Sequence, residues 1–292
     1  MAAGGSAPPP EAVRGAKGMS VVIAVVIAVV TFVAGLGLGY FIAPAPATGP
    51  PRLLLGTNTP FPPFEYYNNT TGGGHVLVGF DIELIQTLVT RSGYSYEWRD
   101  YTDFTALLLA VGSNGVDVAI GAITLSGSVG AQRNASMHFT NSYYTSNQGV
   151  LKRASDATNY CATTTTCTAD DLNKTGLRIA AQTLTTSEYW VEGNAPAATL
   201  ALYGSVTQVL QALSSGSADI VVIDKPAADG IAKANTAFKV QGTIFTNELY
   251  GFAVPRLRDQ DDPKGLIPKL NAALAAVKTD GTYDALLKKY FG

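Results

Sequence analysis

One apolar segment near the N-terminus restricts what this chain can fold into more than any other feature. Residues 20–43 contain no charged side chain and consist mainly of Val, Ile, Ala, Leu, Phe and Gly. As a helix that rises 1.5 Å per residue, the segment is about 36 Å long, and the hydrocarbon core of a bilayer is about 30 Å thick. We therefore expect a transmembrane helix over residues 20–43 and not a soluble cytoplasmic protein.

Basic residues on one side of this segment predict its orientation. Arg14 and Lys17 precede it, whereas residues 44–51, which follow it, carry no charge. The positive-inside rule then keeps residues 1–19 in the cytoplasm and places the rest of the chain outside. Residues 44–51 alternate proline with small residues and predict a semi-rigid linker. The expected location is the cell membrane, crossed once, with an extracellular domain.

A cleaved signal peptide is the alternative interpretation of the apolar segment. The apolar region of a signal peptide usually spans only about 7–15 residues, which is shorter than this one. Ala43, Ala45 and Ala47 nevertheless form an Ala-x-Ala pattern of the kind found at cleavage sites.

Cysteines and sequons fit an exterior location. Cys161 and Cys167 are close in sequence, and in an oxidising compartment a local disulfide is the natural interpretation. A metal site would need further His or carboxylate ligands, and we expect none here. Four asparagines begin N-x-Ser/Thr sequons, which would matter in a host that glycosylates exported proteins: Asn68, Asn69, Asn134 and Asn173.

Charge and motif content argue against two classes of function. The formal net charge is −2 and no basic patch is present, so nucleic acid is not an expected partner. His75 and His138 have no neighbouring Ser or Cys in a nucleophile-like setting, so no catalytic triad is expected. We expect no cofactor.

Hydrophobic periodicity predicts an α/β fold after residue 52. Short apolar runs that end in turn residues predict strands at 52–57, 94–98, 116–123, 177–181 and 220–223. Amphipathic spacing predicts helices at 80–91, 104–111, 206–213, 266–278 and 283–290. Alternating strands and helices indicate mainly parallel sheets, whose ligands bind beyond the carboxyl ends of the strands. The loops that follow residues 57, 123 and 223 are therefore candidate ligand-binding loops.

These loops and the segments between them carry an ordered set of motifs. They are TNTPFPPFE at 57–65, VGFDIEL at 78–84, DVAIGAIT at 117–124, Arg133, QTLTT at 182–186 and Ile-Asp at 223–224. In this order they resemble the extracellular solute-binding proteins of family 3, the type II periplasmic binding proteins of polar amino-acid ABC transporters. The resemblance extends over residues 52–292.

The resemblance implies an α/β fold of two lobes, periplasmic-binding-protein-like and of type II, here preceded by the N-terminal transmembrane helix. Lobe 1 would comprise residues 52–147 and 249–292, and lobe 2 residues 148–248. An amino acid would be held in the cleft between the lobes.

The resemblance also implies residues that would hold the amino-acid backbone. Arg133 matches the arginine that binds the carboxylate, and Asp224 matches the carboxylate that binds the ammonium group, which suits a zwitterion. Ala122, Thr124 and Thr186 match positions that add hydroxyl or N–H donors. From the residues alone, Arg133 could equally be a solvated surface side chain, and Asp224 could cap a helix that starts at Lys225.

Other positions of the resemblance would surround the ligand side chain. Phe61 and Phe104 match an aromatic pair that encloses it, and Asn58 and Gln182 face it. Asn58 stands where an aspartate is common. Since a cationic side chain would be desolvated there without a counter-ion, we expect a neutral, glutamine-like ligand.

Two features could change this interpretation. Glu65 or Asp103 could turn inward and add a negative charge to the cleft. The segment 125–132 is longer than the usual spacing of the family and could displace Arg133.

The expected function is the extracellular substrate-binding component of an ABC transporter, without catalysis. It would capture a polar free amino acid and deliver it to permease subunits in the membrane. One alternative is an extracellular amino-acid sensor or receptor module on the same fold. Another is a cyclohexadienyl-dehydratase-like enzyme, which would need a general acid in the cleft, with Glu188 as the carboxylate to test.

Overall fold

The computed structural model describes residues 49–68, 74–163, 165–257 and 260–292. Residues 1–48, with the predicted cytoplasmic segment, membrane helix and most of the linker, lie outside this part, so the membrane anchor stays a prediction. No helix within the described ranges is long and apolar enough to cross a bilayer. The chain divides into the units Met1–Gly49 and Pro50–Gly292, and every helix and strand described below belongs to the second.

The first lobe is built on a sheet that has six strands within the described residues. They are β1 (Arg52–Thr57), β4 (Ser95–Asp100), β5 (Val118–Ala119), β6 (Met137–Phe139), β12 (Ala253–Leu257) and β13 (Gln260–Asp261). The order is β13-β12-β5-β1-β4, with β6 paired to β12. β1 runs parallel to β4 and β5, whereas β12 is antiparallel to its neighbours.

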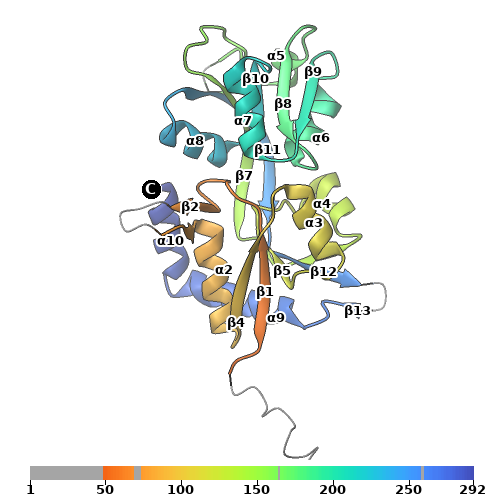
Figure 1. Cartoon of the computed structure of the whole chain (residues 1–292), viewed down its shortest axis with the longest axis vertical. Coiled ribbons are helices and arrows are strands. Elements are labelled where there is room, and N and C mark those ends of the chain that lie inside the picture. The colour runs from red at the N-terminus through yellow and green to blue at the C-terminus, as the bar shows by residue number, and fades with distance from the viewer. Residues whose placement is uncertain (1–48, 69–73, 164, 258–259) are drawn as a thin grey trace, which may run out of the picture. The chain divides into compact units, whose positions relative to one another are not determined.

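The second lobe contains a sheet of five strands in the described residues, in the order β11-β7-β10-β8-β9. They are β7 (Tyr144–Arg153), β8 (Arg178–Gln182), β9 (Thr199–Tyr203), β10 (Ile220–Asp224) and β11 (Phe238–Tyr250). β8 is parallel to β9 and β10, whereas β7 is antiparallel to β10 and β11. The long strands β7 and β11 pair with each other and connect the two lobes (Figure 1).

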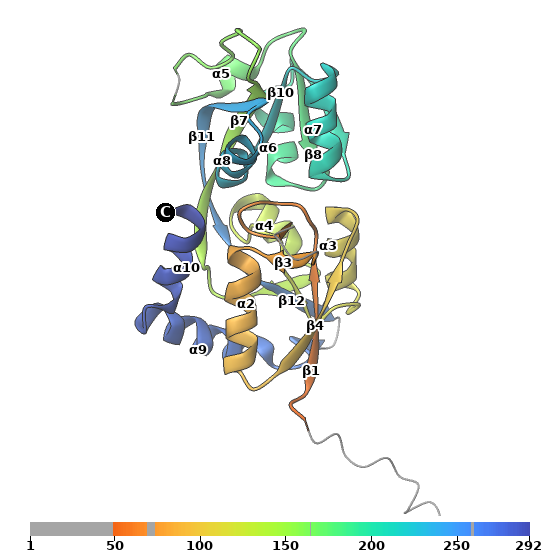
Figure 2. The same ribbon diagram turned by 60° about the vertical axis from the view of Figure 1, so that its left-hand side comes forward.

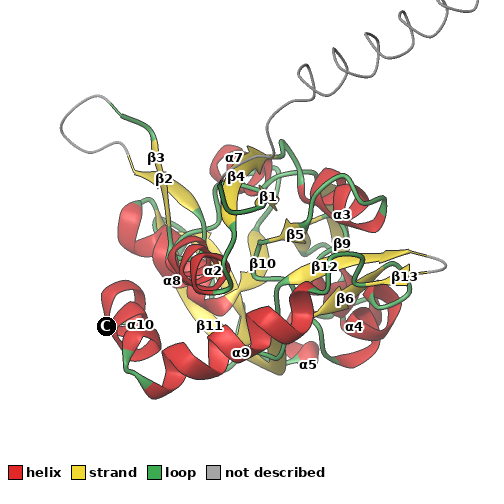
Figure 3. Ribbon diagram, turned by 90° about the horizontal axis from the view of Figure 1, so that it is seen from below, coloured by secondary structure: helices red, strands yellow, loops and turns green. Residues whose placement is uncertain are grey.

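Helices cover both faces of the first sheet because side chains alternate along its strands. On one face, α2 (Phe80–Arg91), α9 (Leu266–Thr279) and α10 (Thr282–Phe291) pack together (Figure 3), and their apolar core includes Leu53 and Leu55. On the other face lies α3 (Phe104–Gly112), whose core includes Leu54. α4 (Gly127–Arg133) follows β5.

Side chains along the strands of the second lobe also alternate between the two faces of their sheet. Val221 and Ile223 of β10 pack with α7 (Val206–Ser215) and α8 (Lys225–Ala234). Ile220 and Val222 face the opposite core, which contains α6 (Thr186–Asn194) and the short α5 (Ala169–Leu172). Figure 2 shows this lobe from a second side.

Two smaller features complete the fold. β2 (Tyr66–Asn68) and β3 (Val76–Val78) form a short antiparallel pair. Cys161 and Cys167 form a disulfide, as predicted, and both are buried against the α6 side of lobe 2.

The sequon residues Asn134 and Asn173 are exposed, and their glycosylation stays a prediction.

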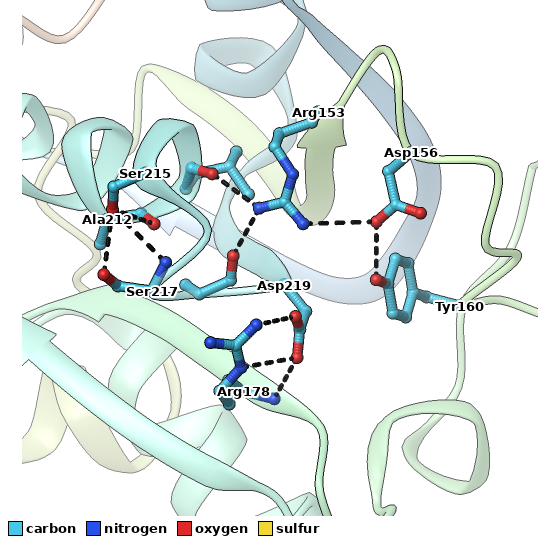
Figure 4. Close-up of polar contacts among 10 residues, drawn as sticks. Arg153, Asp156, Tyr160, Arg178, Ala212, Ser215, Ser217 and Asp219 are labelled. Atoms are coloured by element: carbon cyan, nitrogen blue, oxygen red, sulfur yellow. Dashed lines mark hydrogen bonds and ion pairs between the residues drawn. The ribbon is translucent and has the colours of Figure 1, made fainter.

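A polar cluster ties the strand ends of lobe 2 together (Figure 4). Arg153 at the end of β7 donates to the carbonyl oxygens of Leu213 and Ala218, at 2.7 Å each. Arg178 at the start of β8 pairs with Asp219, just before β10. These contacts fix the strands at the ends opposite to Gln182 and Asp224, which face the candidate site.

The predicted fold class is confirmed: the molecule is a two-lobed α/β protein. The strand predicted at 116–123 is wrong in length, because β5 contains only Val118–Ala119. Beyond it the backbone turns at Ala122, which has a φ of 48°. The lobe boundaries predicted from the resemblance stay predictions.

A glycine positions the loop that follows β1. Gly79 has a φ of 139°, and a Cβ built on it would lie 2.0 Å from the carbonyl oxygen of Phe64. This close approach lets the first N–H groups of α2 donate to the loop, from Phe80 to the Pro63 oxygen and from Asp81 to the Phe64 oxygen. The loop with its site residues is thereby fixed to α2.

We predict that Gly79→Ala lowers the free energy of unfolding by at least about 3 kcal/mol, because it combines a disfavoured φ with a backbone clash. Gly281→Ala is the matched control: its φ is 83°, but no atom of the described residues lies within 4 Å of the place that a Cβ would occupy, so about 1 kcal/mol is expected. Urea denaturation measures both. Equal losses in the two variants would contradict this account of Gly79.

Candidate ligand-binding site

A cavity lies between the two lobes, and interfaces between domains are a common location of small-molecule sites. Its lining comes from the loops after β1 and β5, from α3 and α4 of lobe 1, and from the ends of β8 and β10 with α6 and α7 of lobe 2. All nine residues predicted to bind the ligand line this cavity: Asn58, Phe61, Phe104, Ala122, Thr124, Arg133, Gln182, Thr186 and Asp224.

Arg133 is the buried cation of the cavity. Its guanidinium donates from Nη1 to the Thr124 oxygen and from Nη2 to the Leu184 oxygen, each at 2.9 Å. Within the described part of the chain, these bonds take one N–H of each terminal nitrogen and leave three of the five N–H donors. The ring of Phe104 lies 5.5 Å from the guanidinium carbon. An anionic group in the cavity could therefore bind bidentately to Arg133.

The long segment before Arg133 does not displace it. This segment folds into α4, whose last residue is Arg133. A Cβ on Gly130 would lie 2.0 Å from the Leu125 oxygen, so only glycine allows the helix to pack so closely on the preceding loop. The extra residues are thus accommodated in a helical turn that returns Arg133 to the cavity.

Helix α6 presents its N-terminus to the same cavity. Thr185 caps the helix by accepting from the Glu188 N–H, and Thr186 and Ser187 of the first turn line the cavity. The first N–H groups of a helix have no partner inside the helix and favour negative charge. Arg133 from lobe 1 and α6 from lobe 2 therefore form an anion-binding end.

Asp224 supplies a carboxylate to the cavity from the end of β10. It occupies the N-cap position of α8, but its side chain makes no capping hydrogen bond. Instead it accepts from Nε2 of Gln148 at 2.5 Å and from the hydroxyl of Tyr250. The capping alternative raised by the sequence is therefore wrong, and the carboxylate is available to a cationic group.

A hydrogen-bond network connects Arg133 with Asp224 through β7 and β11, the strands that join the lobes. Gln148 of β7 also donates to Glu248 of β11, at 2.8 Å. Glu248 in turn accepts from the hydroxyl of Thr124, at 2.8 Å. Because Thr124 contacts Arg133 and Gln148 contacts Asp224, the network spans from one charged group to the other.

Asn58 and Gln182 line the cavity but are bonded to each other. Nε2 of Gln182 donates to Oδ1 of Asn58, at 3.2 Å, and to the Gly204 oxygen at 3.0 Å. Nδ2 of Asn58 donates to the Tyr101 oxygen at 2.7 Å. These side chains form a direct bridge between the lobes, so much of their hydrogen-bonding capacity is already used.

Three residues considered from the sequence have roles other than those expected. The N–H of Ala122 donates to Asp81, at 2.9 Å, so it is not a free donor for a ligand. Asp103 caps α3 by accepting from the Ala106 N–H. Glu188 accepts from the Leu184 N–H and is not among the residues that line the cavity.

Several lining residues were missed by the sequence interpretation. Glu65, considered only as a possible inward-facing residue, lines the cavity and is buried. Thr185 and Ser187 could have been found from the helix start they form. Gln148 and Glu248 do not line the cavity but bond to Asp224 and Thr124, which do. They lie on the strands that join the lobes, and no local pattern marks them.

Burial shifts the ionisation of the charged groups. It raises the pKa of Asp224 to about 7, with the Glu248 carboxylate adding to the effect, while Tyr250, Gln148 and Arg133 oppose it. Burial likewise raises the pKa of Asp81 to about 7. The pKa of Arg133 falls to about 10, mainly through burial, so the guanidinium stays charged at neutral pH.

Within the described part of the chain, no group of three or more His, Cys, Asp or Glu side chains is placed to hold a metal ion.

Comparisons with known proteins agree with this geometry. A family model described as bacterial extracellular solute-binding proteins, family 3, matches residues 53–292. The L-cystine-binding protein TcyJ of Escherichia coli (strain K12) is 28% identical over 242 residues, which cover 82% of each chain.

Solved structures with the same fold include two ancestral proteins. An ancestral arginine-binding protein bound to glutamine is 29% identical with a TM-score of 0.69, over 82% of this chain and 98% of that one. The ancestral amino acid-binding protein AncCDT-1, a precursor of cyclohexadienyl dehydratase, is 29% identical with a TM-score of 0.68, over 82% and 95%.

The raised pKa values predict how stability depends on pH. The folded protein holds protons on Asp81 and Asp224 that the unfolded chain releases near pH 4, so stability falls as the pH rises from about 4 to about 7. Between pH 5.5 and 8, each group should lower the free energy of unfolding by roughly 2 kcal/mol. We expect a melting temperature several degrees lower at pH 8 in the absence of amino acids.

Asp224→Asn should reduce this pH dependence. Asp219→Asn is the control, because the pKa of Asp219 is lowered by its pairing with Arg178. A melting temperature that is the same or higher at pH 8 in the unaltered protein would contradict the assignment of buried, protonated carboxyl groups.

Proposed function

The chain belongs to family 3 of the bacterial extracellular solute-binding proteins, and from this we propose that it is the binding component of an ABC transporter that captures a free amino acid outside the cell. The members compared above are named for amino acids, among them cystine and arginine. Amino-acid capture therefore agrees with both the family and the site.

One observation carries the proposal: a buried guanidinium and a buried carboxylate from different lobes line one cavity. Arg133 is 8% exposed and Asp224 is 7% exposed. A free amino acid carries an anionic and a cationic group on the same carbon, so it can satisfy both side chains at once. A ligand with only one of these charges would leave the other side chain without a compensating charge, which is costly in a buried site.

Capture follows from contacts that one ligand makes with both lobes. The α-carboxylate would bind Arg133 and the N-terminus of α6, and the α-ammonium would bind Asp224. Because these groups belong to different lobes, the ligand favours the arrangement in which the lobes are closed. β7 and β11 connect the lobes and are the elements about which such a movement would occur.

The partners follow from this role. The closed, loaded protein would dock on permease subunits in the membrane and deliver the amino acid to them. The proposed location is the outer side of the cell membrane, held there by the helix predicted at residues 20–43. No catalytic step is proposed, since Glu188, the general acid considered for a dehydratase, does not line the cavity.

The side chain of the ligand is proposed to be polar. Phe61 and Phe104 supply apolar walls, and the lining also contains Asn58, Gln182 and Glu65. The two amides alone would favour a neutral, glutamine-like side chain.

We predict that Arg133→Ala and Asp224→Asn each weaken amino-acid binding by about 30-fold or more, because each leaves a charged group of the ligand unpaired. Isothermal titration calorimetry with a panel of the twenty amino acids measures this loss. Circular dichroism checks that the fold survives.

Two conservative controls separate this effect from general damage. Arg178→Ala removes an exposed arginine paired with Asp219 at the far end of lobe 2, and Asp229→Asn removes an exposed carboxylate of α8. Both should bind normally. Retained affinity in the Arg133 or Asp224 variant would overturn the proposed orientation of the ligand.

A further inference from the structure

Glu65 is a buried carboxylate for which the amino-acid backbone has no use. It follows the loop after β1, lines the cavity and is only 1% exposed. Its Oε2 atom receives no hydrogen bond from any described residue. Gly121 lies against it: a Cβ built there would be 3.9 Å from Oε1 of Glu65. Such a group is expected to have a partner that the protein alone does not supply.

The other buried carboxylates near the cavity do have partners. Asp81 accepts from Tyr143 and Ala122. Glu248 accepts from Gln148 and Thr124. Oδ1 of Asp81 also has no hydrogen-bond partner among the described residues, but Asp81 does not line the cavity. Glu65 is therefore the carboxylate that combines an unpartnered oxygen with a place in the lining of the cavity.

The charges that line the cavity do not balance for a neutral zwitterion. Glu65, Arg133 and Asp224 are the ionisable residues among those that line it in the described structure. A zwitterion neutralises Arg133 with its carboxylate and Asp224 with its ammonium group. One negative charge then stays on Glu65, and an isolated carboxylate in a closed site costs several kcal/mol unless it is protonated or meets a cation.

We propose that Glu65 binds a positively charged group on the ligand side chain, so that the substrate class is an amino acid with a cationic side chain. This inference rests on the proposed function and refines it. It replaces the neutral side chain expected from Asn58 and Gln182, whose amides are bonded to each other and to the backbone carbonyls of Tyr101 and Gly204.

The surroundings of Glu65 favour a protonated carboxyl group in the empty site and an ionised one beside a cation. Burial raises the pKa of Glu65 well above its ordinary value, and the carboxylates of Asp81, Asp224 and Asp100 add to the effect. The empty site therefore favours the protonated form of Glu65. A cationic side chain stabilises the ionised form, so this proton is released to solvent when the ligand binds.

Arginine and citrulline form the best pair of probes, because citrulline has the same length but a neutral ureido group in place of the guanidinium. Lysine and glutamine form a second cationic and neutral pair. Calorimetry on the full chain at pH 7, in buffers of different ionisation enthalpy, gives both the affinity and the number of protons released. Any proton that Asp224 releases is released with all four ligands. The difference in proton release between the two members of a pair therefore measures the proton released by Glu65.

In the unaltered protein we expect the cationic member of at least one pair to bind 10-fold or more tightly than the neutral member. It should also release a larger fraction of a proton. In Glu65→Gln both differences should disappear, with the affinity for the neutral member changed by less than about 3-fold. Glu83→Gln, which removes a carboxylate of α2 paired with Lys289, is the control and should keep both differences.

The outcomes separate this inference from the proposed function. Neutral amino acids that bind as tightly as the cationic ones in the unaltered protein would overturn the role of Glu65 and leave amino-acid capture intact. An undiminished preference for the cation in Glu65→Gln would overturn it too. Failure of every amino acid to bind would overturn the proposed function and this inference with it.

Discussion

The site depends on two opposite charges that the fold buries from two sides. Arg133 ends a helix of lobe 1 and Asp224 ends a strand of lobe 2, and both are more than nine-tenths buried. Removing either charge from water is costly unless a counter-charge is close. Each has only partial compensation from the protein, through carbonyl oxygens for Arg133 and through Gln148 and Tyr250 for Asp224. The proposed zwitterionic ligand would supply the missing counter-charge to each of them.

The two strands that join the lobes carry the polar network that relates these charges. Gln148 on β7 and Glu248 on β11 are both buried and bonded to each other. They lie where the chain passes between lobes, so a movement of one lobe would alter the contacts of Asp224 and Thr124 together. The same strands thus serve as the covalent connection and as part of the electrostatic environment of the ligand.

The local sequence pattern is sufficient to predict the position and type of the elements with strong hydrophobic periodicity. β1 and α2 match their predicted bounds, and β10 differs by one residue, because each buries an uninterrupted apolar run or stripe. β7 and β11 have mixed polar sequences and were not predicted, since their burial comes from tertiary packing.

The residues of the cavity were predicted from a family resemblance rather than from periodicity. Glu65 shows the limit of both approaches, because only the assembled cavity reveals that one of its carboxylate oxygens is buried without a hydrogen-bond partner among the described residues.

The most direct test of the central claim compares the tightest-binding amino acid with two analogues by calorimetry: the α-amide, which lacks the carboxylate charge, and the deaminated acid, which lacks the ammonium. If the cavity recognises both charges of one backbone, each analogue should bind about 30-fold more weakly or worse. Either analogue binding within about 3-fold of the parent amino acid would show that one end of the ligand is not held as described.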